Sequence, residues 1–562
     1  MDTKRLILFV VFSFSILLLW DTWQRKHVPV TEVASQQDVR VPAEKLKTAQ
    51  DTQAIAGDSG FKLDSGPRIK VSTDLYQVEI DSLGGDIRRL LLNNHLANNS
   101  QDQFLLLDDV KKPNLYIVRS GLLAKNSNVL PDHNSVYSFE KNNYQLADGS
   151  NTLDVRLTFK NQDVEVNKII TFVRGSYEIS VRYEILNHSK SIVDGLAYYE
   201  VLHDDLSSRS SSTQPSFSGI SYFTREANFT KIKPSSIKFK NEKNENLSLA
   251  SNDGWIGFLQ HYFISAWILP ENISRHFYTE RLDKNIFRAG VSSNFDSILP
   301  GQKKEISSKL YSGPQTKADL IKAAPGLDLS VDYGMLTFIC SPLFVVLSWI
   351  YKLVNNWGGA IILLTVLIKI LFYPLSAASY KSMAQLRELA PRLQSMKEKF
   401  GDDKVKFQQA MLELYRTEKI NPMGGCLPIL IQIPVFISLY WVLMGAVELR
   451  HAPFFGWITD LSAPDTLFGI LPVFNMPIGL LPIIMGISMI VQTKLNPAPT
   501  DPMQAKLMMA MPIIFSVFFF YFPAGLVLYW VINNLLSILQ QWMINRSIHA
   551  ATLAKKGNAA RK

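Results

Sequence analysis

Cysteine is almost absent from this chain of 562 residues. Only Cys340 and Cys426 occur, both beside or within apolar segments, so the long hydrophilic region before them folds without disulfide bonds. The sequence also lacks the H-E-x-x-H, C-x-x-C and G-x-S-x-G motifs and the phosphate loop that mark common catalytic and metal sites. We therefore expect no enzyme activity, no cofactor and no metal ion.

Acidic side chains are missing from the long apolar runs. Uncharged runs lie at 6–20, 333–351, 353–368, 420–447, 466–493 and 507–545. Such runs are typical of a polytopic membrane protein, and the charged sequence at 21–332 predicts a large hydrophilic insert. Because no embedded carboxylate is available for proton coupling, and no inverted repeat of the runs is visible, a pump or symporter is disfavoured.

The last apolar run is too long for one membrane span. Its 39 residues would measure about 58 Å as one helix, almost twice the roughly 30 Å thickness of the hydrocarbon layer. Pro523-Ala524-Gly525 lies near the middle of this run and disrupts helical geometry. We expect two short spans joined by a tight turn.

Basic residues near the apolar runs set the expected orientation. The segment 374–425 carries nine Lys and Arg residues, whereas 448–465 carries only Arg450. The tail after residue 545 adds five basic residues and no acid. We therefore place 374–425 and the tail in the cytoplasm. Counting the spans backward from them places the large hydrophilic region on the outer side and the N-terminus in the cytoplasm, because the charges around the first run alone are ambiguous. No small-residue cleavage site follows the first run closely, which favours an uncleaved signal-anchor.

The outer region alternates apolar and polar residues with the two-residue period of β-strands. The pattern is regular at 76–81, 153–159 and 177–185, and turns rich in Asn, Gly and Ser separate such runs. Many short strands of this kind predict a large antiparallel β-sandwich. Residues 28–60 contain no aromatic side chain, which is typical of a flexible tether.

Two further helical features are expected. Residues 331–354 are apolar but contain Asp332, Pro342 and Lys352, which predicts an amphipathic helix lying on the outer membrane surface. Apolar residues recur every three or four positions within 382–419, which predicts a charged helical hairpin whose first helix is kinked or restarted at Pro391. This hairpin is either a solvated connector or a docking surface for an incoming chain or a ribosome.

Lys369 stands alone in an apolar stretch, after sixteen uncharged residues and before eleven more. A cation inside a span costs roughly 2.5–3.5 kcal/mol on insertion scales, which makes Lys369 a candidate functional residue. Thr365 shares its helix face. Polar side chains of other runs could converge with these two on a hydrated groove: Gln432, Ser488, Gln492, Asn533, Ser537, Gln540 and Gln541. Alternatively, Lys369 snorkels to the interface and the polar side chains make ordinary interhelical hydrogen bonds.

Four motifs closely resemble those of the bacterial YidC membrane insertases: Tyr373-Pro374-Leu375, Asn421-Pro422-Met423-Gly424-Gly425-Cys426-Leu427-Pro428, Asp501-Pro502-Met503-Gln504 and Phe522-Pro523-Ala524-Gly525-Leu526-Val527-Leu528-Tyr529-Trp530. This resemblance covers about 327–546, and the anchor, tether and outer β domain are similar to the Gram-negative form. It implies five spans around a cytoplasm-facing groove that is open to lipid. It also implies a protein that inserts and helps fold membrane proteins, alone or with the Sec translocon.

The chain departs from the family pattern at three places. The family usually has Arg where this chain has Lys369, which keeps the cation but loses the bidentate guanidinium. The family favours two tyrosines where this chain has Tyr529-Trp530, and extra sequence near 467–479 lengthens the outer loop. The outer domain resembles sugar-mutarotase β-sandwiches, but no catalytic pair maps onto it, so we expect a binding or scaffold module.

The resulting fold prediction is a membrane α-helical bundle, with a five-span core and an N-terminal signal-anchor, plus a large periplasmic antiparallel β-sandwich. The expected segments are a cytoplasmic N-terminus (1–5), a transmembrane signal-anchor (6–23), a tether (24–60), the periplasmic β-sandwich (61–325), the interfacial helix (331–354), transmembrane segment 2 (355–375), the cytoplasmic hairpin (376–422), transmembrane segment 3 (423–447), a periplasmic loop (448–477), transmembrane segment 4 (478–495), a cytoplasmic loop (496–506), transmembrane segments 5 (507–523) and 6 (524–544) and a basic cytoplasmic tail (545–562).

The expected function is insertion of newly made proteins into the bacterial inner membrane. The expected partners are nascent membrane proteins, the Sec translocon, membrane lipids and, through the hairpin and tail, the ribosome, with no other nucleic acid. The alternatives are a transporter of small anions and a membrane-anchored carbohydrate-active or carbohydrate-binding protein. The expected substrate groove is formed by Lys369, Thr365, Gln432, Ser488, Gln492, Tyr529, Trp530, Asn533 and Ser537.

Overall fold

The computed structural model describes residues 63–559, with gaps at 98–101, 111–114, 126–128, 205–216, 240–245, 284, 334–335, 401–402, 419–426, 473 and 496–501. The predicted N-terminus, signal-anchor and tether (1–5, 6–23 and 24–60) lie outside the described residues. The described chain forms two compact units. We call them the β unit (63–337 and 444–448) and the helical unit (338–443 and 449–559), and each is described by itself.

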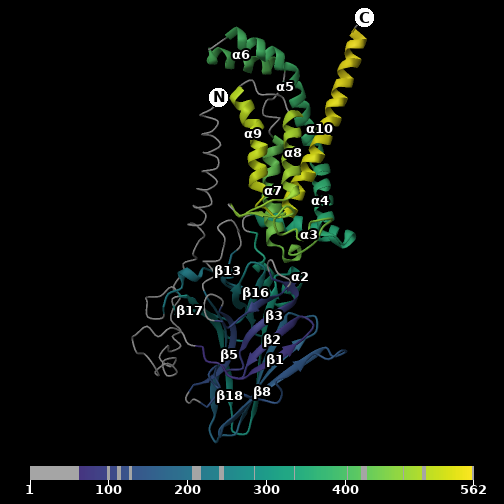
Figure 1. The fold of residues 1–562 in the computed structure, drawn as a ribbon. Coiled ribbons are helices and arrows are strands. Elements are labelled where there is room, and N and C mark those ends of the chain that lie inside the picture. Colours follow the sequence, from purple (N-terminus) through teal and green to yellow (C-terminus); the bar gives the residue numbers. More distant parts are fainter. Residues whose placement is uncertain are drawn as a thin grey trace. The chain divides into compact units, whose positions relative to one another are not determined.

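The β unit consists of two large sheets (Figure 1). In spatial order, the first contains β14 (Ser248–Ser251), β17 (Arg275–Asp283), β18 (Ile286–Ile298), β11 (Val193–Asp204), β5 (Tyr116–Ala124), β3 (Ile87–Leu96), β2 (Tyr76–Asp81), β1 (Arg68–Ser72) and β7 (Asn143–Gln145), with β4 (Gln103–Leu107) paired to β3. The second contains β13 (Asn228–Ile232), β12 (Gly219–Thr224), β15 (Trp255–Leu259), β16 (Phe263–Ile268), β19 (Lys303–Pro314), β10 (Glu178–Asn187), β9 (Val164–Val173), β8 (Thr152–Lys160) and β6 (Ser138–Phe139). Apart from the parallel pair β1–β7, the pairings are antiparallel.

The alternating sequence pattern explains this packing. Along β10, Ile179, Val181, Tyr183 and Ile185 are buried while the residues between them are partly exposed, because successive side chains of a strand point to opposite faces. The buried rows of both sheets form one apolar cluster, whose burial supplies the main favourable free energy of folding. The predicted antiparallel β-sandwich is confirmed.

The β unit continues beyond its last strand. The helix α2 (Lys317–Ala323) and the 3₁₀ turn η3 (Leu327–Ser330) follow β19. Leu320 and Leu327 are fully buried and pack with Trp255 in a second apolar cluster. The segment after the predicted boundary at residue 325 therefore belongs to the β unit.

Eight helices form the described part of the helical unit: α3 (Thr337–Val354), α4 (Trp357–Leu371), α5 (Tyr373–Phe400), α6 (Lys404–Thr417), α7 (Leu427–Gly445), α8 (Leu480–Leu495), α9 (Pro502–Phe519) and α10 (Ala524–Ala559). The axis bends by 67° between α4 and α5. α5 continues through Pro391, so the restart that we considered there is not observed. α9 and α10 are separate helices, as the sequence at Pro523 predicts, and α10 extends well into the predicted tail.

Among the described residues, α3 is long and apolar enough to cross a membrane by length and composition. The bent pair of α4 and α5 counts as a second such segment if it is one span, and shorter apolar stretches lie in α7, α8 and α9. The predicted span count and the surface location of 331–354 therefore stay predictions. α3 itself is a helix, and little of it is buried.

Candidate functional site

Lys369 lies in the last turn of α4 and contacts α10. Its Nζ donates a hydrogen bond of 2.7 Å to Ser537 Oγ, and Ser537 Oγ in turn donates to the carbonyl of Asn533, also at 2.7 Å. Tyr380 of α5 also interacts with Ser537. Ser537 and Asn533 are buried and Lys369 is half-buried. The cation therefore has a neutral hydroxyl as its hydrogen-bond partner.

Thr365 shares the α4 face with Lys369 but is already satisfied within the helix. Its Oγ1 donates to the carbonyl of Ile361 at 2.7 Å, and its side chain is buried. Thr side chains in helices commonly bond in this way to the carbonyl four residues earlier. Thr365 thus contributes packing at this level of the bundle, and its hydroxyl proton is used within its own helix.

Gln432 and Tyr529 connect α7 to α10. Gln432 Nε2 donates a hydrogen bond to the hydroxyl of Tyr529, which is almost fully buried. Phe436, one turn along α7, stacks with the Tyr529 ring and meets Trp530 edge-on, with centroids 4.5 Å apart in the second pair. Trp530 Nε1 is buried without a hydrogen-bond partner in the described part of the chain. This part of the predicted site is an aromatic cluster with one polar link.

Ser488 of α8 belongs to a third contact with α10. Its Oγ donates to the carbonyl of Met485 and accepts a hydrogen bond of 3.1 Å from Asn534 Nδ2. Gln492, one turn further along α8, is half-buried. The predicted set of site residues omits Asn534 and Tyr380. Asn534 could have been found from the sequence, because any amide in an uncharged run needs a partner.

Predicted site residues of three helices thus contact α10 at three places. α4 contributes Lys369, α7 contributes Gln432, and α8 contributes Ser488. Each of these three residues hydrogen-bonds to a different residue of α10, namely Ser537, Tyr529 and Asn534 in the same order. The interhelical hydrogen bonds that we offered as an alternative are present. The hydrated groove stays a prediction.

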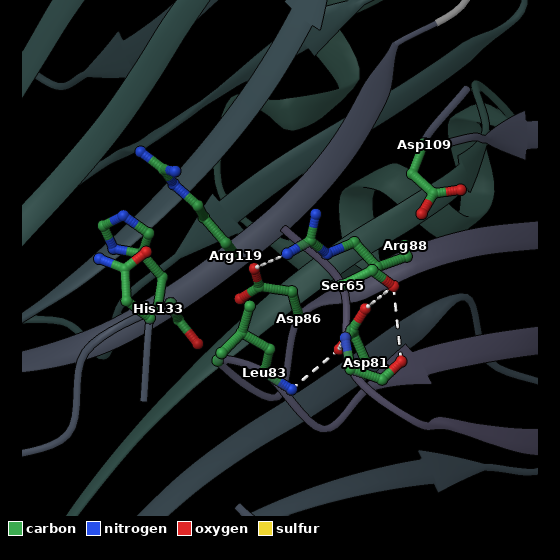
Figure 2. Close-up of polar contacts among 12 residues, drawn as sticks. Ser65, Asp81, Leu83, Asp86, Arg88, Asp109, Arg119 and His133 are labelled. Carbon is green, nitrogen blue, oxygen red and sulfur yellow. Dashed lines mark hydrogen bonds and ion pairs between the residues drawn. The ribbon is translucent and has the colours of Figure 1, made fainter. Parts of the chain in front are cut away.

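The β unit contains its own polar cluster near the start of β3 (Figure 2). Asp86 and Arg88 are buried and pair at 3.1 Å. Lys168 of β9 reaches across the sandwich and donates to the carbonyls of Gly84 and Ser120 at 2.8 and 3.2 Å. Burial raises the pKa of Asp86 to about 6 against the opposing effect of Arg88, and burial lowers the pKa of Lys168 to about 8. The cluster ties the two sheets together.

A second ion cluster of the β unit surrounds Glu200 of β11. Its carboxylate accepts from Arg119 Nε at 2.6 Å, from Arg288 at 3.1 Å and from the Tyr278 hydroxyl at 2.7 Å. Burial alone would raise the pKa of Glu200, but the two guanidinium groups hold it at about 2. The carboxylate is thus fixed in the ionised form by partners on three other strands of the same sheet. This arrangement stabilises the sheet and leaves the carboxylate little basicity for proton transfer.

Comparisons with known proteins agree with this architecture. A family model described as "60Kd inner membrane protein" matches residues 349–551, and one described as "YidC periplasmic domain" matches residues 68–346. The protein named "Membrane protein insertase YidC" from Methylobacillus flagellatus is 54% identical over 571 residues, covering 100% of both chains. Its namesake from Aromatoleum aromaticum is 46% identical, covering 98% of both.

A solved structure of an active YidC insertase is also similar, with 19% identity and a TM-score of 0.40, covering 85% of this chain and 92% of the other. The two family models cover the β unit and the helical unit in turn. The relatives cover the whole chain at identities far above the level at which a shared family is in doubt. The chain therefore belongs to the YidC family of membrane protein insertases.

Proposed function

We propose that this protein moves hydrophobic segments of newly made proteins from the cytoplasm into the inner membrane and helps them fold there, alone or with the Sec translocon. Family membership supports insertion as the activity. Within the chain, the observation that carries the proposal is the surroundings of Lys369. This residue is a cation in an apolar helix, and its hydrogen-bond partner is the neutral hydroxyl of Ser537. The role is that of a chaperone for insertion, with no enzyme activity and no cofactor.

The mechanism is physical rather than covalent. Polar groups of a substrate cost several kcal/mol each when they enter hydrocarbon without partners. An acidic group of the substrate replaces Ser537 as the partner of Lys369, because a carboxylate adds the attraction of an opposite charge to the hydrogen bond that the ammonium makes with a hydroxyl. The hydrophobic segment then leaves sideways into lipid, driven by burial of its apolar surface. The hydrated groove formed by the predicted site residues is part of this proposal.

The orientation is also proposed. The C-terminus and the hairpin of α5 and α6 lie in the cytoplasm, because their Lys and Arg residues favour that side. Counting the predicted spans backward from them places the N-terminus there as well. The β unit lies in the periplasm, in keeping with the family description of that part of the chain. The exposed basic face of the hairpin, with Arg392 and Lys406 at its surface, is the proposed contact for a ribosome or an incoming chain.

Site-specific photo-crosslinking during translation of a single-span protein tests this function. A crosslinker at Gln432, which is half-buried beside α10, should capture the nascent chain. A matched crosslinker at Leu367, which is 49% exposed on α4, should give mainly lipid adducts. Equal capture from both positions would contradict a defined substrate path. A transporter of small anions would capture no nascent chain from either position.

A further inference from the structure

The loop between α7 and α8 ends in a small β-hairpin. Its strands β20 (Ile470–Leu471) and β21 (Met476–Pro477) pair antiparallel, and two backbone hydrogen bonds between Phe468, Gly469 and Ile478 close the ladder at 2.8–2.9 Å. Residues 466–479 contain no charged side chain. The hairpin is therefore an ordered element that is wholly uncharged, which is unusual for a segment in contact with water.

The hairpin exposes most of its apolar side chains. Phe474 is 72% exposed, Phe468 59% and Ile470 57%, and the neighbours Leu467 and Leu471 are exposed as well. Side chains of Ile470 and Leu471 point to opposite faces of a strand, so neither face is covered. Single exposed apolar residues are ordinary, but a contiguous set marks an interaction surface.

The hairpin is held firmly to the helices. Buried Asp465 accepts hydrogen bonds from the backbone of Leu481 at 2.9 Å, from the backbone of Leu467 at 3.1 Å and from Trp457 Nε1 at 3.3 Å. The backbone of Ala463 also accepts from Ala524 at the start of α10, at 2.8 Å. These contacts hold the hairpin in place, so its apolar side chains are exposed as part of the folded structure.

The position of the hairpin indicates what covers it. Within the helical unit it lies at the end opposite α6 (Figure 1). Tyr521, just after α9, donates a hydrogen bond of 3.3 Å to the carbonyl of Phe474. The exposed face of α9, with Ile514 57% and Phe518 55% exposed, therefore continues into the hairpin. If α9 spans the membrane as the sequence predicts, that face contacts lipid.

The side-chain chemistry favours lipid over a protein. Protein interfaces combine an apolar centre with a polar rim, and residues 466–479 have no charge to form one. Phe455 and Trp457 add exposed aromatic rings to the same loop, and aromatic residues are enriched at membrane–water interfaces. We propose that hairpin 466–479 inserts into the outer leaflet beside α9, at the boundary between headgroups and acyl chains, and fixes the depth of the helical unit.

Fluorescence quenching by labelled lipid tests this proposal on the full chain. Cys340 and Cys426 are replaced by Ser, and an environment-sensitive NBD dye is attached at Ile470→Cys or Phe474→Cys. The protein is reconstituted into vesicles of phosphatidylethanolamine and phosphatidylglycerol that carry a nitroxide on the lipid. Ile514→Cys on α9 is the lipid-exposed reference, and Gln409→Cys on the exposed surface of α6 is the water reference.

We expect blue-shifted emission at both hairpin positions and at least half of the quenching measured at Ile514→Cys. Emission and quenching equal to those at Gln409→Cys would place the hairpin in water and overturn the proposal. Blue-shifted emission without lipid quenching would overturn it as well, because a protein surface would then cover the hairpin. The two hairpin positions guard against a local effect of either substitution.

Discussion

The two units surround a buried or half-buried charged side chain with opposite kinds of partner. In the β unit, the Glu200 carboxylate is surrounded by Arg119 and Arg288, so its partners come with the fold. In the helical unit, Lys369 has the neutral Ser537 as its hydrogen-bond partner. Buried charges are costly unless they are paired. In our proposal, this cation, which a neutral hydroxyl holds in place, binds a carboxylate from another molecule.

Removing Glu200 should give the largest effect. Glu200→Ala leaves Arg119 without its counter-charge and Arg288 with Glu280 alone, and breaking a buried ion pair costs about 3–5 kcal/mol. The free energy of unfolding can be measured by urea titration of a fragment of residues 61–337, which contains the main core of the β unit. Glu280→Ala is the control, because Glu280 is more exposed and pairs with Arg288 at the edge of the same cluster. Equal losses would contradict a special role for the Glu200 cluster.

The second largest effect is expected from Asp86, in the pH dependence of the free energy of unfolding of the β unit. Burial raises the pKa of Asp86 from 3.8 to about 6, so the folded state holds a proton that the unfolded chain has released. The contribution of Asp86 to stability is then fully present below pH 3.8 and is lost as the pH rises to about 6. A shift of this size corresponds to about 3 kcal/mol. The same fragment with Asp86→Asn should lack this loss, so the stability difference between the two fragments should change between pH 4 and 6. A difference independent of pH would refute the raised pKa.

Reversing the charge of Lys369 should impair insertion. Hydrogen bonds to charged groups contribute about 1.5–3 kcal/mol, so Lys369→Glu should slow insertion of a substrate with an acidic translocated segment at least about tenfold. Lys369→Arg keeps the cation and should retain most of the activity. Insertion is measured in proteoliposomes, with a substrate of neutral translocated segment as the control. If Glu and Arg at this position give equal rates, the charge of Lys369 is unimportant and the comparison between the two units fails.

The sequence predicted helices and strands better than it predicted contacts between side chains. Alternation of apolar residues predicted strands such as β10 because the period of a strand is a local property. The break at Pro523 was predictable for the same reason, since it depends on one residue and the length of the run. At Pro391 a kink or a restart was expected, and of these the restart is not observed, because α5 runs through this residue to Phe400.

Contacts of the predicted site depend on how helices pack, which local pattern does not encode. Polarity in apolar runs selected Lys369 and Ser537, which hydrogen-bond to each other, while their role in a substrate site stays a prediction. It gave no hint that Thr365 bonds within its own helix or that Ser488 pairs with Asn534. The ion clusters of the β unit were missed entirely, because charged residues on strands look solvated until the tertiary fold buries them.

The smallest effect is expected where the helical unit pairs neutral groups. Gln432→Leu removes the hydrogen bond to the buried Tyr529 hydroxyl and should lower the stability of the full protein in detergent by about 1 kcal/mol. Gln492→Leu, at a half-buried amide of α8, is the matched control and should change the melting temperature less. A loss at Gln432 as large as that of Glu200→Ala would mean that neutral pairs of the bundle are as critical as the ion clusters of the sandwich. The two units would then not differ in how they hold their polar groups, and the argument for an available charge at Lys369 would lose its basis.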